Sequence, residues 1–183
     1  MSYLSDVSQK KEQHSARKSK SDYLACELDK IYTSNEYTAT AAEGDSLNLA
    51  MAVSYLLLFY KGLNVKILDM KGISPLADYF VIADVQNSVQ ASAIASEIAY
   101  QVKRLQRQIR GVEGGSESNW TLIDLNSVIV HLFIEKSREI YNLESLWPHA
   151  IRITVPDAFY YNSQNSASKY LEHNSADSEK DYY

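Results

Sequence analysis

The sequence predicts a single small α/β domain in which helices flank a mixed β-sheet. Three observations support this prediction. A long apolar segment with helical character comes first, and two short apolar runs typical of strands follow it. A second, amphipathic helix pattern then leads into two more such runs. Helices and strands in this order pack as a layer of helices on a sheet.

Length and composition divide the chain into three parts. The 183 residues have room for one domain with tails, and we expect the domain over 46–150. Residues 1–45 are polar and lack a sustained apolar period, so we expect a largely disordered extension with room for a short helix around 23–32. Residues 151–183 begin with an alternating run that is typical of an edge strand. They continue as an acidic tail that we expect to be flexible.

Cysteine content and hydropathy favour the cytoplasm. Cys26 is the single cysteine, which excludes an internal disulfide. The polar N-terminus does not resemble a secretory signal. The longest apolar run, residues 47–60, is shorter than the roughly 20 residues that cross a bilayer. We therefore expect this run to be a core helix of a cytoplasmic protein.

The first half of the domain predicts one helix and two strands. Asp45 or Ser46 suits the N-cap of a helix over 47–61, which a glycine ends. Apolar side chains cover nearly the whole circumference of this helix, which indicates packing on more than one side. Short apolar runs over 65–70 and 78–84 predict two strands, separated by a turn with glycine and proline.

A long amphipathic helix follows the two strands. Asn87 suits its N-cap, with Gln90 placed for a capping box, and apolar residues recur at helical spacing as far as Ile109. Four basic residues gather at its C-terminal end: Lys103, Arg104, Arg107 and Arg110. Cations at that end complement the helix dipole. We interpret them as a solvated helix end and keep direct contact with RNA as the alternative.

Residues 120–147 organise the second half of the domain. The apolar runs 120–123 and 128–133 are joined by a polar turn and predict a β-hairpin. A polar connection over 111–119 precedes it, and a charged segment and a short helix follow it. The second run, which contains His131, is apolar at almost every position, so we expect both of its faces to be covered.

No motif in the sequence points to an enzyme. The chain lacks a Walker-type loop and a Gly-x-Gly-x-x-Gly fingerprint, and its histidines lack metal-ligand spacing, so we expect no metal and no cofactor. Asp124 and His131 could form an acid–base pair, but a turn carboxylate and a core or groove histidine are the simpler interpretation. The remaining enzyme alternative is a nucleotidyltransferase-like site in which Asp69, Asp78 or Asp84 holds a divalent cation.

Several strings of the chain occur in the same order in one known family. They are 65–69 with 71–74, 77–82, 87–90 with 93–95, 111–114, the hairpin positions Trp120, Leu122, Asp124 and 128–133, and the closing positions Arg138, Tyr141, Leu143, Glu144, Leu146 and Trp147. On these residues the chain resembles the ribosomal silencing factor family, also called Iojap-like proteins, over about residues 46–148. The resemblance is specific because several independent motifs keep the family's spacing.

This resemblance implies a fold related in shape to nucleotidyltransferases, without their metal-binding carboxylates and without catalytic chemistry. It also implies binding to the large ribosomal subunit at ribosomal protein number fourteen. That binding would keep the small subunit from joining and repress translation when nutrients are short. By the same resemblance, the partner surface includes or adjoins Trp120, Asp124, His131, Arg138, Tyr141, Glu144 and Trp147. A position in the core is the alternative for Phe133, Tyr141, Leu143, Leu146 and Trp147.

Charge and departures from the family pattern bear on the partners. Residues 111–156 carry six acids and three bases, which favours a basic protein partner, with solvated charges as the alternative. Residues 54–60 of the first helix are more apolar than is usual in the family, Val89 stands where a basic residue is common, and both tails are longer. These departures leave open a homodimer of the free protein.

Overall fold

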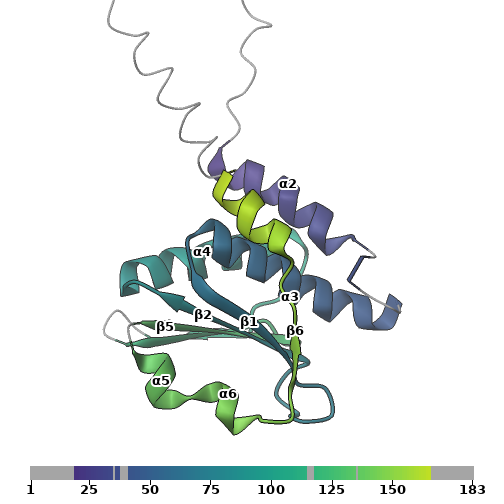
Figure 1. The fold of residues 1–183 in the computed structure, drawn as a ribbon. Helices are drawn as coiled ribbons and strands as arrows, with labels where there is room; N and C mark the ends of the chain where they lie inside the picture. Colours follow the sequence, from purple (N-terminus) through teal and green to yellow (C-terminus); the bar gives the residue numbers. More distant parts are fainter. Residues whose placement is uncertain (1–18, 35, 38–40, 115–117, 135, 166–183) are drawn as a thin grey trace, which may run out of the picture.

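A six-stranded mixed sheet forms the centre of the computed structural model (Figure 1). Its strands are β1 (Leu63–Asp69), β2 (Tyr79–Val85), β3 (Gly111–Glu113), β4 (Trp120–Asp124), β5 (Val128–Ile134) and β6 (Ile151–Ile153), in the spatial order β3-β4-β5-β2-β1-β6. β2 and β5 run parallel, and the other neighbouring pairs are antiparallel. The predicted fold class is confirmed. The structure describes residues 19–34, 36–37, 41–114, 118–134 and 136–165.

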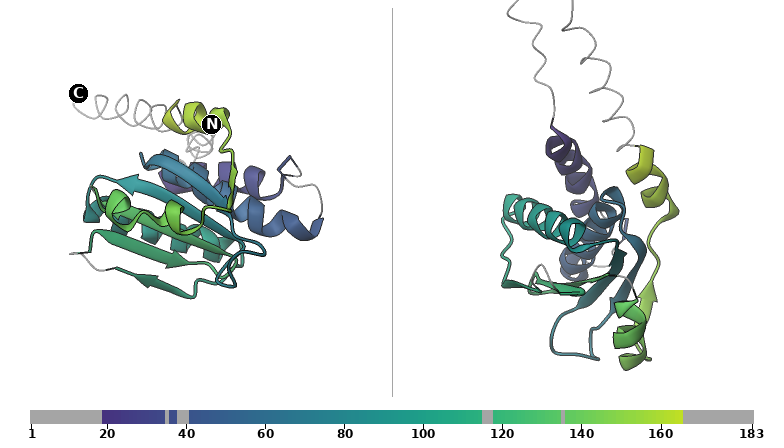
Figure 2. Two further views of the ribbon diagram at one scale, coloured as in Figure 1. Left: turned by 60° about the horizontal axis from the view of Figure 1, so that its bottom comes forward. Right: turned by 90° about the vertical axis from the view of Figure 1, so that its left-hand side faces the viewer.

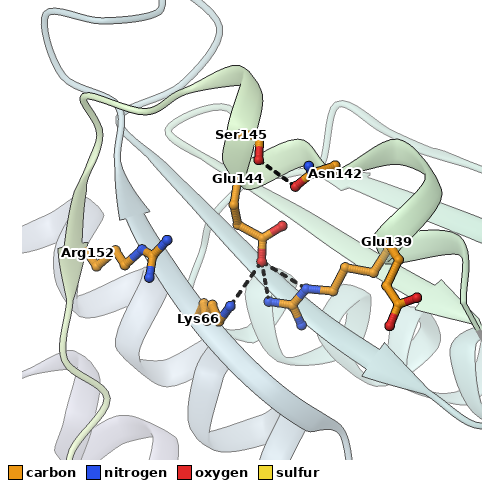
Figure 3. A pocket seen from close by; sticks show the side chains of 7 residues that line it. Lys66, Glu139, Asn142, Glu144, Ser145 and Arg152 are labelled. Atoms are coloured by element: carbon orange, nitrogen blue, oxygen red, sulfur yellow. Dashed lines mark hydrogen bonds and ion pairs between the residues drawn. The ribbon is translucent and has the colours of Figure 1, made fainter.

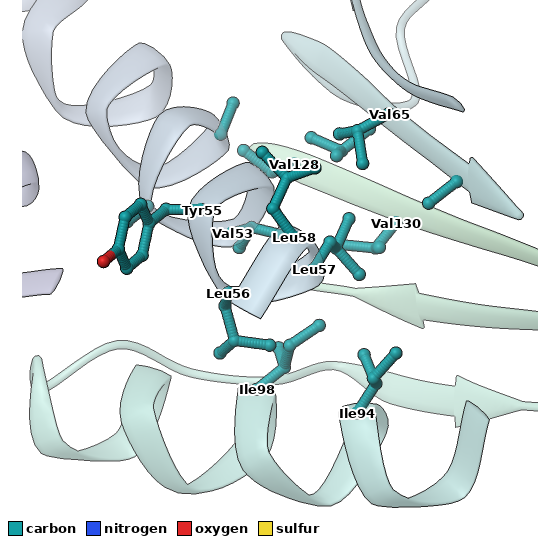
Figure 4. Packing of buried hydrophobic residues seen from close by; sticks show 14 of the residues in the cluster. Val53, Tyr55, Leu56, Leu57, Leu58, Val65, Ile94, Ile98, Val128 and Val130 are labelled. Atoms are coloured by element: carbon teal, nitrogen blue, oxygen red, sulfur yellow. The ribbon is translucent and has the colours of Figure 1, made fainter. Parts of the chain in front are cut away.

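Helices α3 (Ala41–Phe59) and α4 (Ser88–Arg104) cover one face of the sheet, which we call the first face, and α2 (Lys20–Tyr32) packs on α3. α3 lies in the middle and contacts α2, α4 and strands β1, β2 and β5. Figure 4 shows Leu56 and Leu57 of α3 among Ile94 and Ile98 of α4 and Val130 of β5. The apolar helix therefore packs on more than one side, as its sequence predicts.

The start of α3 differs from the prediction. Asp45 and Ser46 do not cap the helix, because α3 already begins at Ala41. Their side chains have tertiary partners instead: the Asp45 carboxylate pairs with Arg107, and the Ser46 hydroxyl donates a hydrogen bond to Asp78 (2.7 Å). Because these two side chains bind residues that are distant in sequence, they do not cap a helix N-terminus, and the helix extends past them towards Ala41.

The N-terminal extension contributes to the core. α2 begins with a capping box between Ser19 and Asp22, and it buries Leu24 and Leu28 in the core that it shares with α3. The expected boundary at residue 46 therefore does not mark the start of the folded chain. Four apolar residues at helical spacing suffice to dock a segment whose overall composition is polar. Residues 1–18 lie outside the described part of the chain.

α4 and the connection after it follow the prediction in part. Asn87 caps α4 by accepting a hydrogen bond from the Gln90 N–H (2.8 Å). The Gln90 side chain accepts from the Gln86 N–H rather than completing a capping box on Asn87. The helix ends at Arg104 rather than near Ile109, since Gln106 adopts a positive φ of 57°. The expected polar connection contains a strand, β3, which pairs with β4.

Two short helices lie over the opposite face of the sheet, which we call the second face: α5 (Ser137–Tyr141) and α6 (Leu143–Leu146). Asn142 joins them in the left-handed conformation, with φ 42° and ψ 51°. A smaller core lies beneath them and comprises Leu68, Met70, Phe80, Ile82, Ile129, Phe133 and Leu143. Within the described chain, α5 and α6 leave β3 and β4 uncovered on this face (Figure 2).

The C-terminal segment adds a further cover to α3. β6 pairs with β1 at the sheet edge, in agreement with the predicted edge strand. Residues 157–165 are helical, and Phe159 packs edge-on against Tyr55 (ring centroids 5.4 Å apart) and Tyr37 (6.0 Å). The expectation of a flexible tail is wrong for this stretch, because a buried aromatic ring anchors it. The remainder, 166–183, falls outside the described residues.

These covers explain the apolar surface of α3 within one chain. Residues 48–59 are all buried, and they contact α2, the sheet, α4 and Phe159. The observation that suggested a homodimer therefore has an intramolecular explanation. Among the helices that the structure describes, none is long and apolar enough to cross a membrane.

A candidate partner-binding face

Strand alternation sets the composition of the second face. In β5, Ile129, His131 and Phe133 point to this face, because side chains two residues apart lie on one side of a strand. β4 places Trp120 opposite Phe133 and Leu122 opposite His131. Residues opposite each other in neighbouring strands share a face, so the aromatic residues of the hairpin gather there.

Six ring-bearing residues form a continuous row on the second face, which we call the aromatic cluster: Phe80, Trp120, His131, Phe133, Tyr141 and Trp147. The Trp120 ring lies 4.7 Å from Tyr141, 5.2 Å from Phe133 and 5.7 Å from His131, measured between centroids. Phe80 continues the row, 4.9 Å from His131 and 6.4 Å from Trp147. Sequence analysis missed Phe80, because its neighbours depend on the parallel pairing of β2 with β5.

The cluster is buried at its centre and open at its ends. Phe133 is fully buried, Tyr141 is 50% exposed, and Trp120 is half-buried. Ile140 and Leu146 on the same short helices are 78% and 65% exposed. Phe133 and Leu143 belong to the core, as the alternative interpretation predicted. Tyr141 and Leu146 reach solvent. Trp147 is half-buried and packs on Phe80. Exposed aromatic and aliphatic side chains that adjoin each other are typical of an interaction surface.

His131 orients the Trp120 ring. The Trp120 indole N–H donates a hydrogen bond to His131 Nδ1 (3.3 Å), and His131 is 4% exposed. Burial lowers the pKa of His131 to about 4, so the ring is neutral at pH 7. Its Nε2 is buried and has no hydrogen-bond partner among the described residues. This arrangement fits a groove histidine that supports its neighbour rather than an acid or base.

Asp124 lies at the turn end of the hairpin and does not pair with His131. Its carboxylate accepts a hydrogen bond from the Asn126 N–H (2.8 Å), and its strand partner is Ile129. Asp124 shares the second face with Trp120, and Glu113 of β3 joins them because it lies opposite Leu122. Two carboxylates therefore flank the uncovered strands beside the aromatic cluster.

Arg138 and Glu144 point into the protein. The Arg138 guanidinium donates to Glu144 Oε1 from Nε (2.9 Å) and Nη2 (2.7 Å), and from Nη1 to the Asn64 carbonyl (2.8 Å) and Asp84 (3.1 Å). Lys66 also reaches Glu144, at 3.2 Å (Figure 3). Burial alone raises the pKa of Glu144, but the hydrogen bonds from Arg138 and Lys66 outweigh it and lower that pKa below its ordinary value. In the free chain both side chains are engaged in ion pairs within the fold, and their contact with a partner stays a prediction.

A polar groove lies beside α5 and α6. A hollow of about 310 Å³ is lined by Lys66, Arg138, Glu139, Asn142, Glu144, Ser145 and Arg152 (Figure 3). A second hollow of about 440 Å³ adjoins it through Lys66, Arg138 and Glu139. Both hollows are lined by positive and negative side chains, so the groove carries no strong net charge.

The three carboxylates of the enzyme alternative do not meet. Asp78 precedes β2 and accepts a hydrogen bond from Ser46, whereas Asp84 lies near the other end of β2 and pairs with Arg138. Asp69 binds the Lys71 backbone N–H. Within the described residues, the structure has no group of three or more side chains that could hold a metal ion.

The basic helix end also has structural partners. Arg104 forms an ion pair with Asp29 of α2 (2.8 Å), and Arg107 pairs with Asp45 of α3. These two guanidinium groups therefore join α4 to the helices beside it. Only part of the predicted basic cluster, including Lys103 and Arg110, is left for a nucleic acid.

Comparisons with known proteins give one consistent result. A family model described as "Ribosomal silencing factor during starvation" matches residues 43–182. The ribosomal silencing factor of Bacillus subtilis is 46% identical over 83 residues, which cover 45% of this chain and 70% of the relative. The chloroplastic Iojap protein of Arabidopsis thaliana is 27% identical over 130 residues, 69% of this chain and 54% of the relative. A crystal structure of a protein from Chromobacterium violaceum superposes with a TM-score of 0.50 at 26% identity, covering 56% of this chain and 83% of that one.

Proposed function

The chain belongs to the ribosomal silencing factor family, and from this membership we propose that it binds the large ribosomal subunit through ribosomal protein number fourteen. Bound there, it keeps the small subunit from joining and so represses translation when nutrients are limiting. Its role is regulatory and its place of action is the cytoplasm. No chemical step is required, because a folded body that occupies the joining surface is sufficient.

The observation that carries this proposal is the aromatic cluster, in which Tyr141 is exposed and Trp120 and Trp147 are half-buried. Trp120 and Tyr141 each stack on the buried Phe133 and lie tilted against each other, so both rings are held rigidly. Rigid aromatic side chains lose little conformational entropy on binding and dominate the energetics of most protein interfaces. Ile140 and Leu146 are further exposed apolar side chains on the same two short helices. This combination favours a protein partner over bare RNA.

The charges around the cluster support a basic partner. Glu113 and Asp124 lie on the same face as Trp120, at the uncovered strands β3 and β4. Carboxylates at the rim of an apolar contact accelerate association with a positively charged protein and fix its orientation. Arg138 and Lys66 do not oppose this effect, because both are paired with Glu144.

Gradient sedimentation tests the proposal directly. The purified chain is mixed with isolated large or small subunits, and small subunits are then added to its complex with large ones. We expect the chain to travel with large subunits alone and to reduce the yield of joined ribosomes. If it travels with neither subunit, or binds large subunits without reducing joining, the proposal is wrong.

A pair of tyrosine variants locates the contact. Tyr141 and Tyr100 are about equally exposed, at 50% and 54%, but Tyr100 lies on α4 at the first face. Tyr141→Ala should weaken large-subunit binding by about 2 kcal/mol or more, roughly 30-fold, as expected of an interface anchor. Tyr100→Ala is the matched control and should bind as the unchanged chain does. Equal losses in both variants would place the contact elsewhere.

A further inference from the structure

The helices that carry Tyr141 are too short to hold their own position. α5 has five residues and α6 has four, and α5 lacks a side-chain N-cap. Isolated helices shorter than about 12 residues are marginal in water. Asn142, which joins the two helices, adopts a left-handed backbone conformation that is unfavourable for most residues. The position of α5 and α6 on the sheet must therefore come from contacts with the rest of the chain.

Arg138 supplies the most extensive polar contact of this kind. Its guanidinium joins three parts of the fold: the start of β1 through the Asn64 carbonyl, the end of β2 through Asp84, and α6 through Glu144. The Arg138 side chain is only 10% exposed. Arg138 and Lys66 balance the charges of Asp84 and Glu144, so this network has no surplus charge to offer a partner.

The same residue lies one helical turn from the exposed ring. Tyr141 follows Arg138 by three residues in α5, and the Asn142 N–H donates to the Arg138 carbonyl (2.8 Å). Fixing the guanidinium between sheet and α6 thereby fixes the backbone that carries Tyr141. That backbone places the Tyr141 ring 4.7 Å from Trp120 and 6.1 Å from Phe133.

We propose that Arg138, with Glu144 as its anchor, is a positioning residue that holds Tyr141 against Trp120 and so preorganises the surface that docks on the ribosome. The inference rests on the proposed function for its effect on binding, but not for its effect on the free protein. Arg138 makes no contact with the partner. It acts through Tyr141, and preorganisation of this kind raises affinity by lowering the cost of ordering the surface.

Arg138→Lys is the most direct variant. Lysine keeps the positive charge but replaces the planar, forked guanidinium by a single ammonium, which cannot reach Glu144, Asp84 and the Asn64 carbonyl together. We expect large-subunit affinity to fall about tenfold, less than for Tyr141→Ala, because the ring is displaced part of the time rather than removed. Glu144→Gln removes the anchor charge and should act in the same direction if Arg138→Lys does not fold.

A double-mutant cycle on binding separates positioning from direct contact. If Arg138 acts through Tyr141, then Arg138→Lys should cost less than about twofold in affinity once Tyr141 is already alanine. If Arg138 touches the partner, or if the loss comes from general destabilisation, the two losses will multiply. Multiplying losses would overturn the inference.

Trp120 fluorescence tests the same point in the free protein. The chain has two tryptophans, so Trp147→Phe leaves Trp120 as the single emitter. In this background, Arg138→Lys and Glu144→Gln should shift the Trp120 emission as Tyr141 leaves its ring. Glu139→Gln is the matched control on α5, since the Glu139 side chain is exposed and no ion pair joins it to Arg138 among the residues drawn in Figure 3. Unchanged emission in all variants would contradict positioning even if ribosome binding proves absent.

Discussion

The two faces of the sheet differ in how they are covered. Helices α3 and α4, of 19 and 17 residues, lie on the first face, and together with the 13-residue α2 that packs on α3 they bury a large continuous core. On the second face, helices of five and four residues cover a smaller core and leave aromatic rings half-exposed. The first face therefore supplies most of the stability. The second face leaves some apolar and aromatic side chains exposed to solvent, and these side chains are suited to binding a protein partner.

The largest effect should come from the core of the first face. Leu57 is fully buried in the core cluster, so Leu57→Ala should lower the free energy of unfolding by about 2–5 kcal/mol. Leu146→Ala on the second face should change it by less than about 0.5 kcal/mol, since Leu146 is 65% exposed. Urea denaturation measures both values. Similar losses in the two variants would remove the distinction between the faces.

Acid should affect the second face through His131. Its pKa falls from 6.5 to about 4 on folding, so the unfolded chain binds the proton more readily between these values. Stability from this residue is full above about pH 6.5 and declines as the pH falls towards 4, by roughly 3 kcal/mol in total. The measurement is the difference in unfolding free energy between the unchanged chain and His131→Gln across this range. A difference that does not vary with pH would show that His131 is not held neutral by burial.

A smaller effect is expected at the rim of the second face. Asp124→Asn should keep the hydrogen bond from the Asn126 N–H but remove a negative charge next to the uncovered strands. We expect a loss of about 0.5–1 kcal/mol in binding to large subunits, mainly through slower association. Association rates at low and high salt measure this, because screening should abolish the difference. A loss that persists at high salt would indicate a direct contact rather than steering.

Local pattern explains which parts of the fold were predictable. Strands β1, β2 and β6, the Asn87 cap of α4 and the hairpin of β4 and β5 follow from apolar periodicity and turn residues over short stretches, whereas β3 was expected to be a polar connection. The sequence predicted α2 only as a possible short helix, because its few apolar residues lie in a polar segment. These residues are buried only because α2 packs on α3, which the local sequence does not show. Asp45 and Ser46 were expected at the start of α3, but they pair with Arg107 and Asp78, which are distant in sequence.

The candidate site was predictable in a similar, partial way. Trp120, His131 and Tyr141 were named, and the structure brings them together in one cluster. The inward direction of Arg138 and Glu144 could not be read from the sequence, since charged residues are rarely buried unless a tertiary partner compensates them. Phe80 was missed for the same reason: strand pairing is not a local property.

Hydrogen exchange on the ribosome-bound chain tests the central claim, that the second face is the docking surface. Backbone amides of α5, α6 and β3 lie at the edge of this face and should exchange rapidly in the free protein, because their helices and strand are short. We predict that binding to the large subunit slows exchange at residues 111–113 and 137–147 and leaves the exposed side of α4 unchanged. Protection of α4 with no change at 137–147 would contradict the claim.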